Sequence, residues 1–300
     1  MIKNAGGVNM EEDIIKENLD IDERKKNGVK YMQSANTLFN FMPKIEYLYK
    51  KLKEKRIVPR YVSEDAQYLK VPNLQSFETP MICFCDINLH KISPHARGYG
   101  KFNGYGCFAI AFSKEFCLRQ SVQPVHYINE NSDFFNSFSN ALNTALDYIK
   151  QQDTDLEIIL DQFVKNIMYM KPLSGTQNAE IKNFHDEQEW RFVPDLSQSD
   201  MPSFLINKGI LSCKETLYKY NKAIEKLAEA ETGNGTKDTH NICFKFEYSD
   251  IKYLIIDREK NRTEFIKWIM QLKNDENCSD EDCIDLVSKI RVLDTIEEDA

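Results

Sequence analysis

The sequence predicts an α+β fold, with a mixed, largely antiparallel central sheet that is flanked by helices. Short apolar runs such as Met81–Cys85 and Cys107–Phe112 are interspersed with amphipathic helical segments such as Phe134–Gln151. They do not follow the strict strand–helix alternation of a doubly wound sheet. The run Cys107–Phe112 is almost entirely apolar, which is typical of a strand that is buried on both faces. We expect a polar, flexible arm at residues 1–30 and a single α+β domain at residues 31–300.

Each element follows from a local pattern. Thr37–Phe41 is predicted to be a short buried strand, and Pro43–Lys55 a helix, because proline is tolerated in the first turn and the apolar residues face one side. Ser113 is predicted to cap a helix at Lys114–Arg119. Lys171–Asn178 is predicted to be a polar loop. Further strands are predicted at Val125–Ile128, Glu187–Val193, Phe204–Asn207, Ile242–Tyr248, Tyr253–Ile256 and Lys289–Leu293, and further helices at Leu156–Met170, Lys214–Ala230 and Arg262–Leu272.

The charge of the chain is concentrated at its carboxyl end. Residues 274–300 contain ten acidic and two basic residues, a net of −8 that equals the formal charge of the whole chain. Because the remaining residues balance, we do not expect direct nucleic-acid binding, which requires a basic patch. The acidic segment is either a solvated face or a surface that docks on a basic partner.

Composition also restricts the cellular compartment in which the protein is expected. No apolar run approaches the ~20 residues that span a bilayer, and the amino-terminal residues contain no apolar core of a signal peptide. The eight cysteines include no CxxC pair and mostly lie in apolar runs, as small buried hydrophobic residues do. We therefore expect a cytoplasmic protein without a structural metal site.

Three groups of residues are candidates for binding or catalysis. His95 and Tyr99, with His90 and Arg97, lie in a glycine-rich segment between two predicted strands; this segment is either the lip of a pocket or an exposed crossover. Glu187 and Glu189 lie on the same face of a predicted strand, where one could act as a general base, or Arg191 could neutralise Glu189 at a solvated edge. Arg60 follows Pro59 and is either a phosphate or carboxylate clamp or the partner of Glu64 or Asp65.

The chain resembles the AbiGi family of bacterial phage-resistance proteins. The matching segments are Thr37–Tyr61, Pro80–Leu89, the loop from His95 to Gly106, Gln123–Ile128, Asp186–Pro194 and Asp250–Asp257. The resemblance implies a role in abortive infection, as the antitoxin-like partner of a nucleotidyltransferase-like toxin, AbiGii. No cofactor is implied by this resemblance.

A more distant resemblance, to DarT-like ADP-ribosyltransferases, implies a different function. It implies NAD as the cofactor, with Glu189 or Glu187 as the catalytic carboxylate that stabilises the ribose as nicotinamide leaves. Asn40 stands where related sequences carry histidine, so it can hydrogen-bond a ribose but carries no charge. The residues that this resemblance places around the dinucleotide are Asn40, Arg60, His95, Tyr99 and Tyr105. A third interpretation is a small-ligand sensor that uses the same pocket without turnover.

These interpretations share one structural requirement. The histidine-and-tyrosine segment from the first half of the chain has to meet the acidic strand from the second half. We expect Asn40, Tyr99 and Glu189 to converge on one concave surface.

Overall fold

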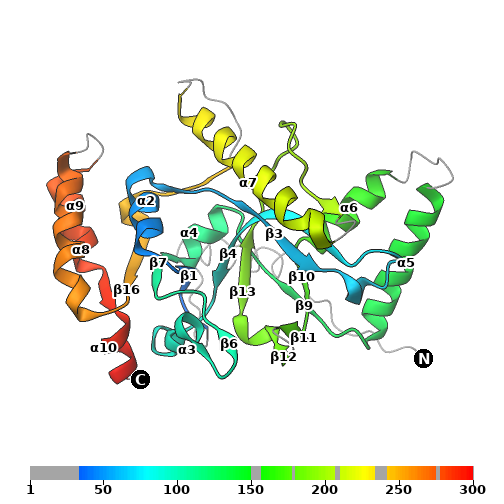
Figure 1. Ribbon diagram of the computed structural model, residues 1–300, viewed down its shortest axis with the longest axis horizontal. Helices are drawn as coiled ribbons and strands as arrows, with labels where there is room; N and C mark the ends of the chain where they lie inside the picture. Colours follow the sequence, from blue (N-terminus) through cyan, green and yellow to red (C-terminus); the bar gives the residue numbers. More distant parts are fainter. Residues whose placement is uncertain are drawn as a thin grey trace, which may run out of the picture.

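A central sheet organises the fold (Figure 1). The computed structural model describes residues 34–149, 157–177, 180–206, 210–233, 242–274 and 278–299. Within these residues the strands lie in the order β17 (Ile290–Val292), β16 (Ile251–Ile256), β7 (Phe108–Ser113), β1 (Thr37–Met42), β4 (Ser76–Cys85), β13 (Glu189–Phe192) and β8 (Gln123–Pro124). Strands β16 and β17 are parallel, whereas the other neighbours in this order are antiparallel. The predicted α+β class and the largely antiparallel sheet are confirmed.

Strand β4 connects two parts of this sheet. Its first half pairs with β3 (Arg60–Asp65) and β14 (Leu205–Ile206), and its second half pairs with β13. Strand β1 pairs with β4 only at Phe39 and Cys85. A cavity lies beside this junction.

Shorter two-stranded pairs surround the sheet. They are β9 (His126–Ile128) with β10 (Met170–Pro172), β11 (Ser174–Gln177) with β12 (Glu180–Asn183), β2 (Arg56–Ile57) with β15 (Phe244–Lys245), and β5 (Gly98–Tyr99) with β6 (Phe102–Asn103).

Side chains of β1 point alternately to the two faces of the sheet, and each face packs against a different hydrophobic cluster. Leu38 and Met42 pack in the cluster that contains α2 (Ile45–Glu54), whereas Phe39 lies in a cluster on the opposite face. The first cluster also includes residues of α4 (Lys114–Arg119), α8 (Glu259–Gln271) and α9 (Asp280–Ser288). The second includes residues of α3 (Ile92–Arg97) and α10 (Leu293–Glu298). Helices therefore cover both faces of the sheet.

Three longer helices cover the other end of the molecule, at the right and top of Figure 1. They are α5 (Asp133–Ile149), α6 (Glu157–Ile167) and α7 (Ile210–Gly233). Helices α5 and α6 form a cluster with Phe77 of β4. Helix α7 packs on β3, where Asn221 Oδ1 accepts a 2.8 Å hydrogen bond from the Tyr61 amide.

Most predicted elements are present with slightly different ends. Ser113 caps α4 as predicted, since its hydroxyl accepts a hydrogen bond from the Phe116 amide. Two predictions are wrong. The segment that contains His95 includes the short helix α3, and most of the predicted polar loop Lys171–Asn178 belongs to strands β10 and β11. Helix α9, which was not predicted, begins with a capping box between Ser279 and Asp282.

The predicted arm at residues 1–30 lies outside the described residues. In the part of the chain that the structure describes, no helix combines the length and the apolar surface needed to cross a bilayer.

Candidate functional site

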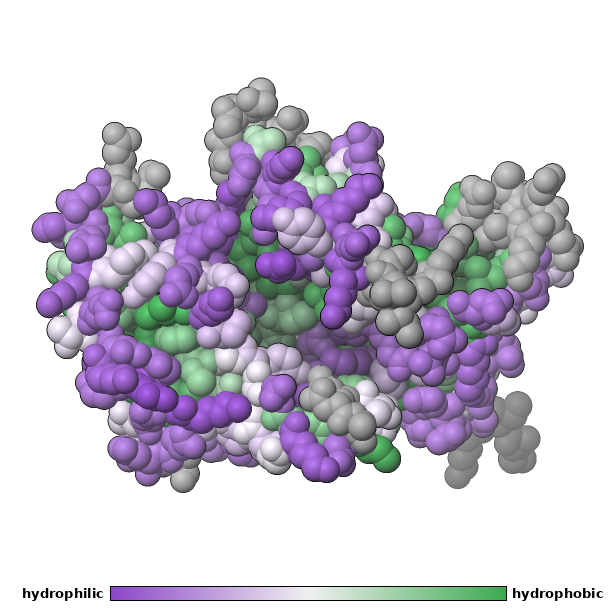
Figure 2. All heavy atoms as spheres, in the orientation of Figure 1, coloured by the Kyte–Doolittle hydropathy of each residue, from purple (hydrophilic) through white to green (hydrophobic). Residues whose placement is uncertain are grey.

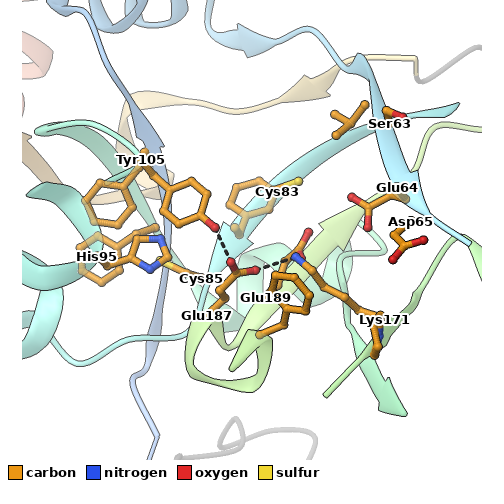
Figure 3. Close-up of a pocket in the computed structure, with 16 residues that line it drawn as sticks. Ser63, Glu64, Asp65, Cys83, Cys85, His95, Tyr105, Lys171, Glu187 and Glu189 are labelled. Atoms are coloured by element: carbon orange, nitrogen blue, oxygen red, sulfur yellow. Dashed lines mark hydrogen bonds and ion pairs between the residues drawn. The ribbon is translucent and has the colours of Figure 1, made fainter. Parts of the chain in front are cut away.

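A cavity of about 370 Å³ lies where β1, β4 and β13 meet the glycine-rich segment (Figure 3). Its walls are largely aromatic, and its polar residues come from strands that are far apart in the sequence. The lining residues used below are Phe39, Phe41, Glu64, His95, Tyr105, Lys171, Glu187 and Glu189. A volume of this size is within the range of small-ligand sites.

Close backbone approaches bring the glycine-rich segment to the cavity. The Tyr105 amide donates to the His95 carbonyl at 3.0 Å, and the Gly106 amide donates to the Ala96 carbonyl at 3.0 Å. Gly106 has a φ of +111°, and a Cβ there would lie 2.2 Å from the Met42 carbonyl oxygen. Only glycine fits this position, and the tight turn directs Tyr105 into the cavity.

The Glu187 carboxylate accepts hydrogen bonds from three different residues. Its Oε2 accepts a 2.6 Å hydrogen bond from Lys171 Nζ, and its Oε1 accepts one of 2.7 Å from Lys182 Nζ and one from the Tyr105 hydroxyl. Figure 3 shows the carboxylate between Tyr105 on one side and Lys171 on the other. Burial favours the neutral acid, but these partners outweigh it, chiefly Lys171, and the net pKa of Glu187 is lowered.

Glu189 is neutralised by two cations. Arg191 Nε donates to Glu189 Oε1 at 2.8 Å, and Lys171 Nζ donates to Oε2 at 3.0 Å. Burial would raise the pKa of Glu189, but Arg191 and Lys171 lower it far below its usual value. Glu187 and Glu189 are therefore ionised at neutral pH, and neither is a general acid there.

The ion pairs continue beneath the cavity floor. Arg191 is completely buried, and its Nη2 donates to Glu64 Oε2 at 2.9 Å while its Nη1 donates to the Met168 carbonyl at 2.8 Å. Three carboxylates thus compensate three cations, and they join strands β3, β10, β12 and β13. We call this set the ion-pair network; its members are Glu64, Glu187, Glu189, Lys171, Lys182 and Arg191.

His95 contributes an uncharged aromatic wall. Its ring stacks on Tyr105, with 4.5 Å between ring centroids, and its other neighbour is Phe41 at 5.1 Å. Burial lowers the pKa of His95 to about 4, so the imidazole is neutral at physiological pH. Burial also raises the pKa of Tyr105, with Glu187 adding to the effect, so its phenol remains a hydrogen-bond donor.

The structure brings together part of the predicted site. His95, Tyr105, Glu187 and Glu189 line the same cavity, so the glycine-rich segment does meet the acidic residues of the second half. Glu187, however, lies in the 3₁₀ turn Phe184–Glu187 rather than in the predicted strand. The roles proposed for these residues stay predictions.

Other predicted residues lie elsewhere. Asn40 is on the opposite face of β1, where its side chain donates to the Cys83 carbonyl at 2.9 Å and accepts from Lys51 Nζ at 2.6 Å.

Arg60 lines a second cavity together with Asn40, and Glu64 pairs with Arg191 instead of with Arg60. Tyr99 is 47% exposed beside a third cavity. Asn40, Tyr99 and Glu189, which were expected to converge, thus line three different cavities that adjoin one another, and their predicted shared role stays a prediction.

Arg97 lies on α3 and forms ion pairs with Asp294 and Glu297 of α10. It therefore ties the glycine-rich segment to the acidic carboxyl end.

The sequence analysis missed Lys171 and Lys182. Lys171 lies in the segment that was predicted to be a polar loop, no element was predicted around Lys182, and no local pattern marks either lysine as a partner of Glu187. The paired acids two residues apart were the available signal, because two buried carboxylates require cations from elsewhere in the chain.

Fold and cavity together define an α+β protein whose central cavity has aromatic walls and a compensated ion-pair network. Residues 55–257 match the sequence family described as "Putative abortive phage resistance protein AbiGi, antitoxin". The chain is 33% identical over 258 residues to the "Abortive phage resistance protein AbiGi" of Lactococcus lactis subsp. cremoris, which covers 81% of this chain and 98% of that protein. The chain therefore belongs to the AbiGi family of abortive phage resistance proteins. No solved structure matches it.

Proposed function

We propose that this protein is the antitoxin of a phage-defence pair, and that it binds and restrains a nucleotidyltransferase-like toxin. The observation that carries the proposal is the family assignment, because the family description contains the word antitoxin and the match covers residues 55–257. The state of the cavity is consistent with binding rather than turnover, since cations already neutralise Glu187 and Glu189, the two acids considered as catalytic residues.

The acidic carboxyl end is our candidate for the toxin-binding surface. Glu281 on α9 and Glu298 and Asp299 at the end of α10 are exposed. Exposed Ile284, 66% accessible, lies among the acids of α9 and offers an apolar contact. A protein that handles nucleotides or nucleic acid carries a basic surface, which these acids complement.

The test is a growth assay with two matched variants. A nucleotidyltransferase-like toxin of the AbiGii type is induced alone, with the wild-type chain, or with a variant that carries Glu281→Gln, Glu298→Gln and Asp299→Asn. The control variant, Glu115→Gln, Asp133→Asn and Asp161→Asn, makes the same change of charge at exposed positions on other helices. We expect the wild type and the control to restore growth and the first variant to restore it less. Failure of the wild type to restore growth would refute the proposal, and equal rescue by both variants would refute the proposed surface.

A second candidate function, NAD-dependent ADP-ribosyl transfer, is favoured by one observation. A carboxylate has about four acceptor positions, and the three donors on Glu187 leave it able to accept one further hydrogen bond, such as that of a ribose hydroxyl, from the cavity. In this function Glu187 or Glu189 would stabilise the ribose cation as nicotinamide leaves. Purified protein would then release nicotinamide from labelled NAD in the presence of cell extract, and Glu187→Gln would abolish the release. Absence of release, where a control transferase is active, would exclude this candidate.

A further inference from the structure

A second cavity, of about 460 Å³, lies on the other side of β1. It is bordered by α2, β3, β4 and one residue of α7, and it shares Phe41, Val62 and Cys83 with the first cavity. On the face of the molecule that Figure 2 displays, a central hollow contains hydrophobic residues and is rimmed by hydrophilic ones. The charged residues that line the second cavity are Lys50, Lys51, Glu54, Arg56, Arg60 and Glu225.

The two acids of this cavity already have cationic partners. Glu54 accepts a 3.1 Å hydrogen bond from Arg56 Nε and lies 3.8 Å from Lys50. Glu225 accepts a 3.0 Å bond from Lys222 on the same helix. The remaining end of Arg56 is also occupied, because its Nη1 donates to the Ala228 carbonyl at 2.6 Å.

Two cations are left without a negative partner. Lys51 Nζ donates to Asn40 Oδ1 at 2.6 Å, but this amide oxygen is neutral. Arg60 is exposed on β3 directly after Pro59. Among the described residues, neither Lys51 nor Arg60 forms an ion pair with a carboxylate.

The environment of Lys51 is unfavourable to its charge. Burial lowers the pKa of Lys51 to about 8, and no anion offsets this effect. Asn40 has its amide nitrogen fixed by the Cys83 carbonyl, so its oxygen holds the ammonium group in one position. A half-buried lysine that is oriented but forms no ion pair with a described carboxylate is the arrangement expected where an anionic ligand supplies the missing charge.

We propose that this second cavity binds a phosphate-bearing small molecule, with Lys51 and Arg60 as the ligands of the phosphate. A guanidinium binds two phosphate oxygens at once and the ammonium group binds a third, and the formal charge of the lining residues, four cations against two acids, matches a dianion. Tyr47, which is 44% exposed on the same cavity, provides an aromatic surface for a base or another planar group. This proposal does not depend on the antitoxin role.

Isothermal titration calorimetry of the full chain tests the site, with inorganic phosphate, pyrophosphate and ADP as probes. We expect at least one probe to bind saturably, and Lys51→Met and Arg60→Gln each to weaken it roughly tenfold or more, as loss of a charged hydrogen bond does. Lys44→Met, which removes an exposed lysine at the start of α2, is the matched control and should bind as the wild type does. Preference for ADP over pyrophosphate would identify a nucleotide, and equal affinity would identify a phosphate group alone.

The pH dependence of the affinity distinguishes a direct contact between Lys51 and the ligand from a general attraction by the positive charge of the cavity. Since only the protonated amine attracts the phosphate, affinity should fall as the pH rises through about 8. In Lys51→Met this fall should disappear, while circular dichroism verifies that the variant is folded. No binding of any probe to the wild type at millimolar concentration, or equal binding by the wild type and both site variants, would overturn the proposal.

Discussion

Replacing Lys171 with methionine should lower the free energy of unfolding by about 3–5 kcal/mol, because it breaks a buried ion-pair network by removing one partner. Lys171 Nζ lies 2.6 Å from Glu187 and 3.0 Å from Glu189, and the three side chains are only 15%, 7% and 8% exposed. The variant leaves three buried carboxylates with two cations, so one negative charge is uncompensated.

The chain offers a matched control and a rescue. Lys165 pairs with Asp161 at 2.7 Å, but these side chains are 58% and 54% exposed, so Lys165→Met should cost less than about 1 kcal/mol. Adding Glu187→Gln to Lys171→Met restores the balance of charge and should recover about 1 kcal/mol or more. Urea unfolding followed by circular dichroism at pH 7 measures all four proteins. Equal stability of the Lys171→Met and Lys165→Met variants would refute the description of the network as buried and coupled.

Two further predictions concern His95 and the glycine-rich segment. Burial lowers the pKa of His95 to about 4 from an ordinary 6.5, so the stability that the neutral imidazole contributes is complete above pH 6.5 and is lost as the pH falls toward 4. In urea titrations at several pH values, His95→Phe should therefore show a smaller loss of stability at low pH than the wild type does. An unchanged pH profile would contradict the neutral, buried imidazole. Gly106→Ala should cost about 3 kcal/mol, since φ is +111° and the new Cβ would lie 2.2 Å from the Met42 carbonyl. Gly100→Ala should cost only about 1 kcal/mol, because φ is +56° and no atom lies within 4 Å, and equal thermal stability of the two variants would contradict the close approach at Gly106.

Local patterns predicted much of the fold. The Ser113 cap and the short, largely apolar run Thr37–Phe41 are short-range signals, and the structure contains both elements within a residue or two of the predicted ends. Segments without such a signal were missed. Lys171 was predicted to lie in a polar loop. It belongs to strand β10, which forms by pairing with β9, more than forty residues earlier in the sequence, and local sequence does not reveal such a pairing.

The candidate site was predicted only in part for a similar reason. Periodicity placed Glu189 and Arg191 on one face of a strand and favoured a solvated edge, but both side chains are buried. Alternation of charged and apolar residues along a strand does not distinguish a solvent-exposed face from a buried face whose charges are neutralised by distant residues such as Glu64. Asn40 was placed on a strand correctly, but a single strand does not specify which face meets the cavity.

The most direct test of the antitoxin role is a binding measurement with purified components. The wild-type chain and a nucleotidyltransferase-like toxin of the AbiGii type are mixed at micromolar concentration and analysed by size-exclusion chromatography with light scattering. We predict a single complex whose mass contains both proteins and whose formation is weakened by loss of Glu281, Glu298 and Asp299. Separate elution of the two proteins under conditions where each is folded would contradict the account.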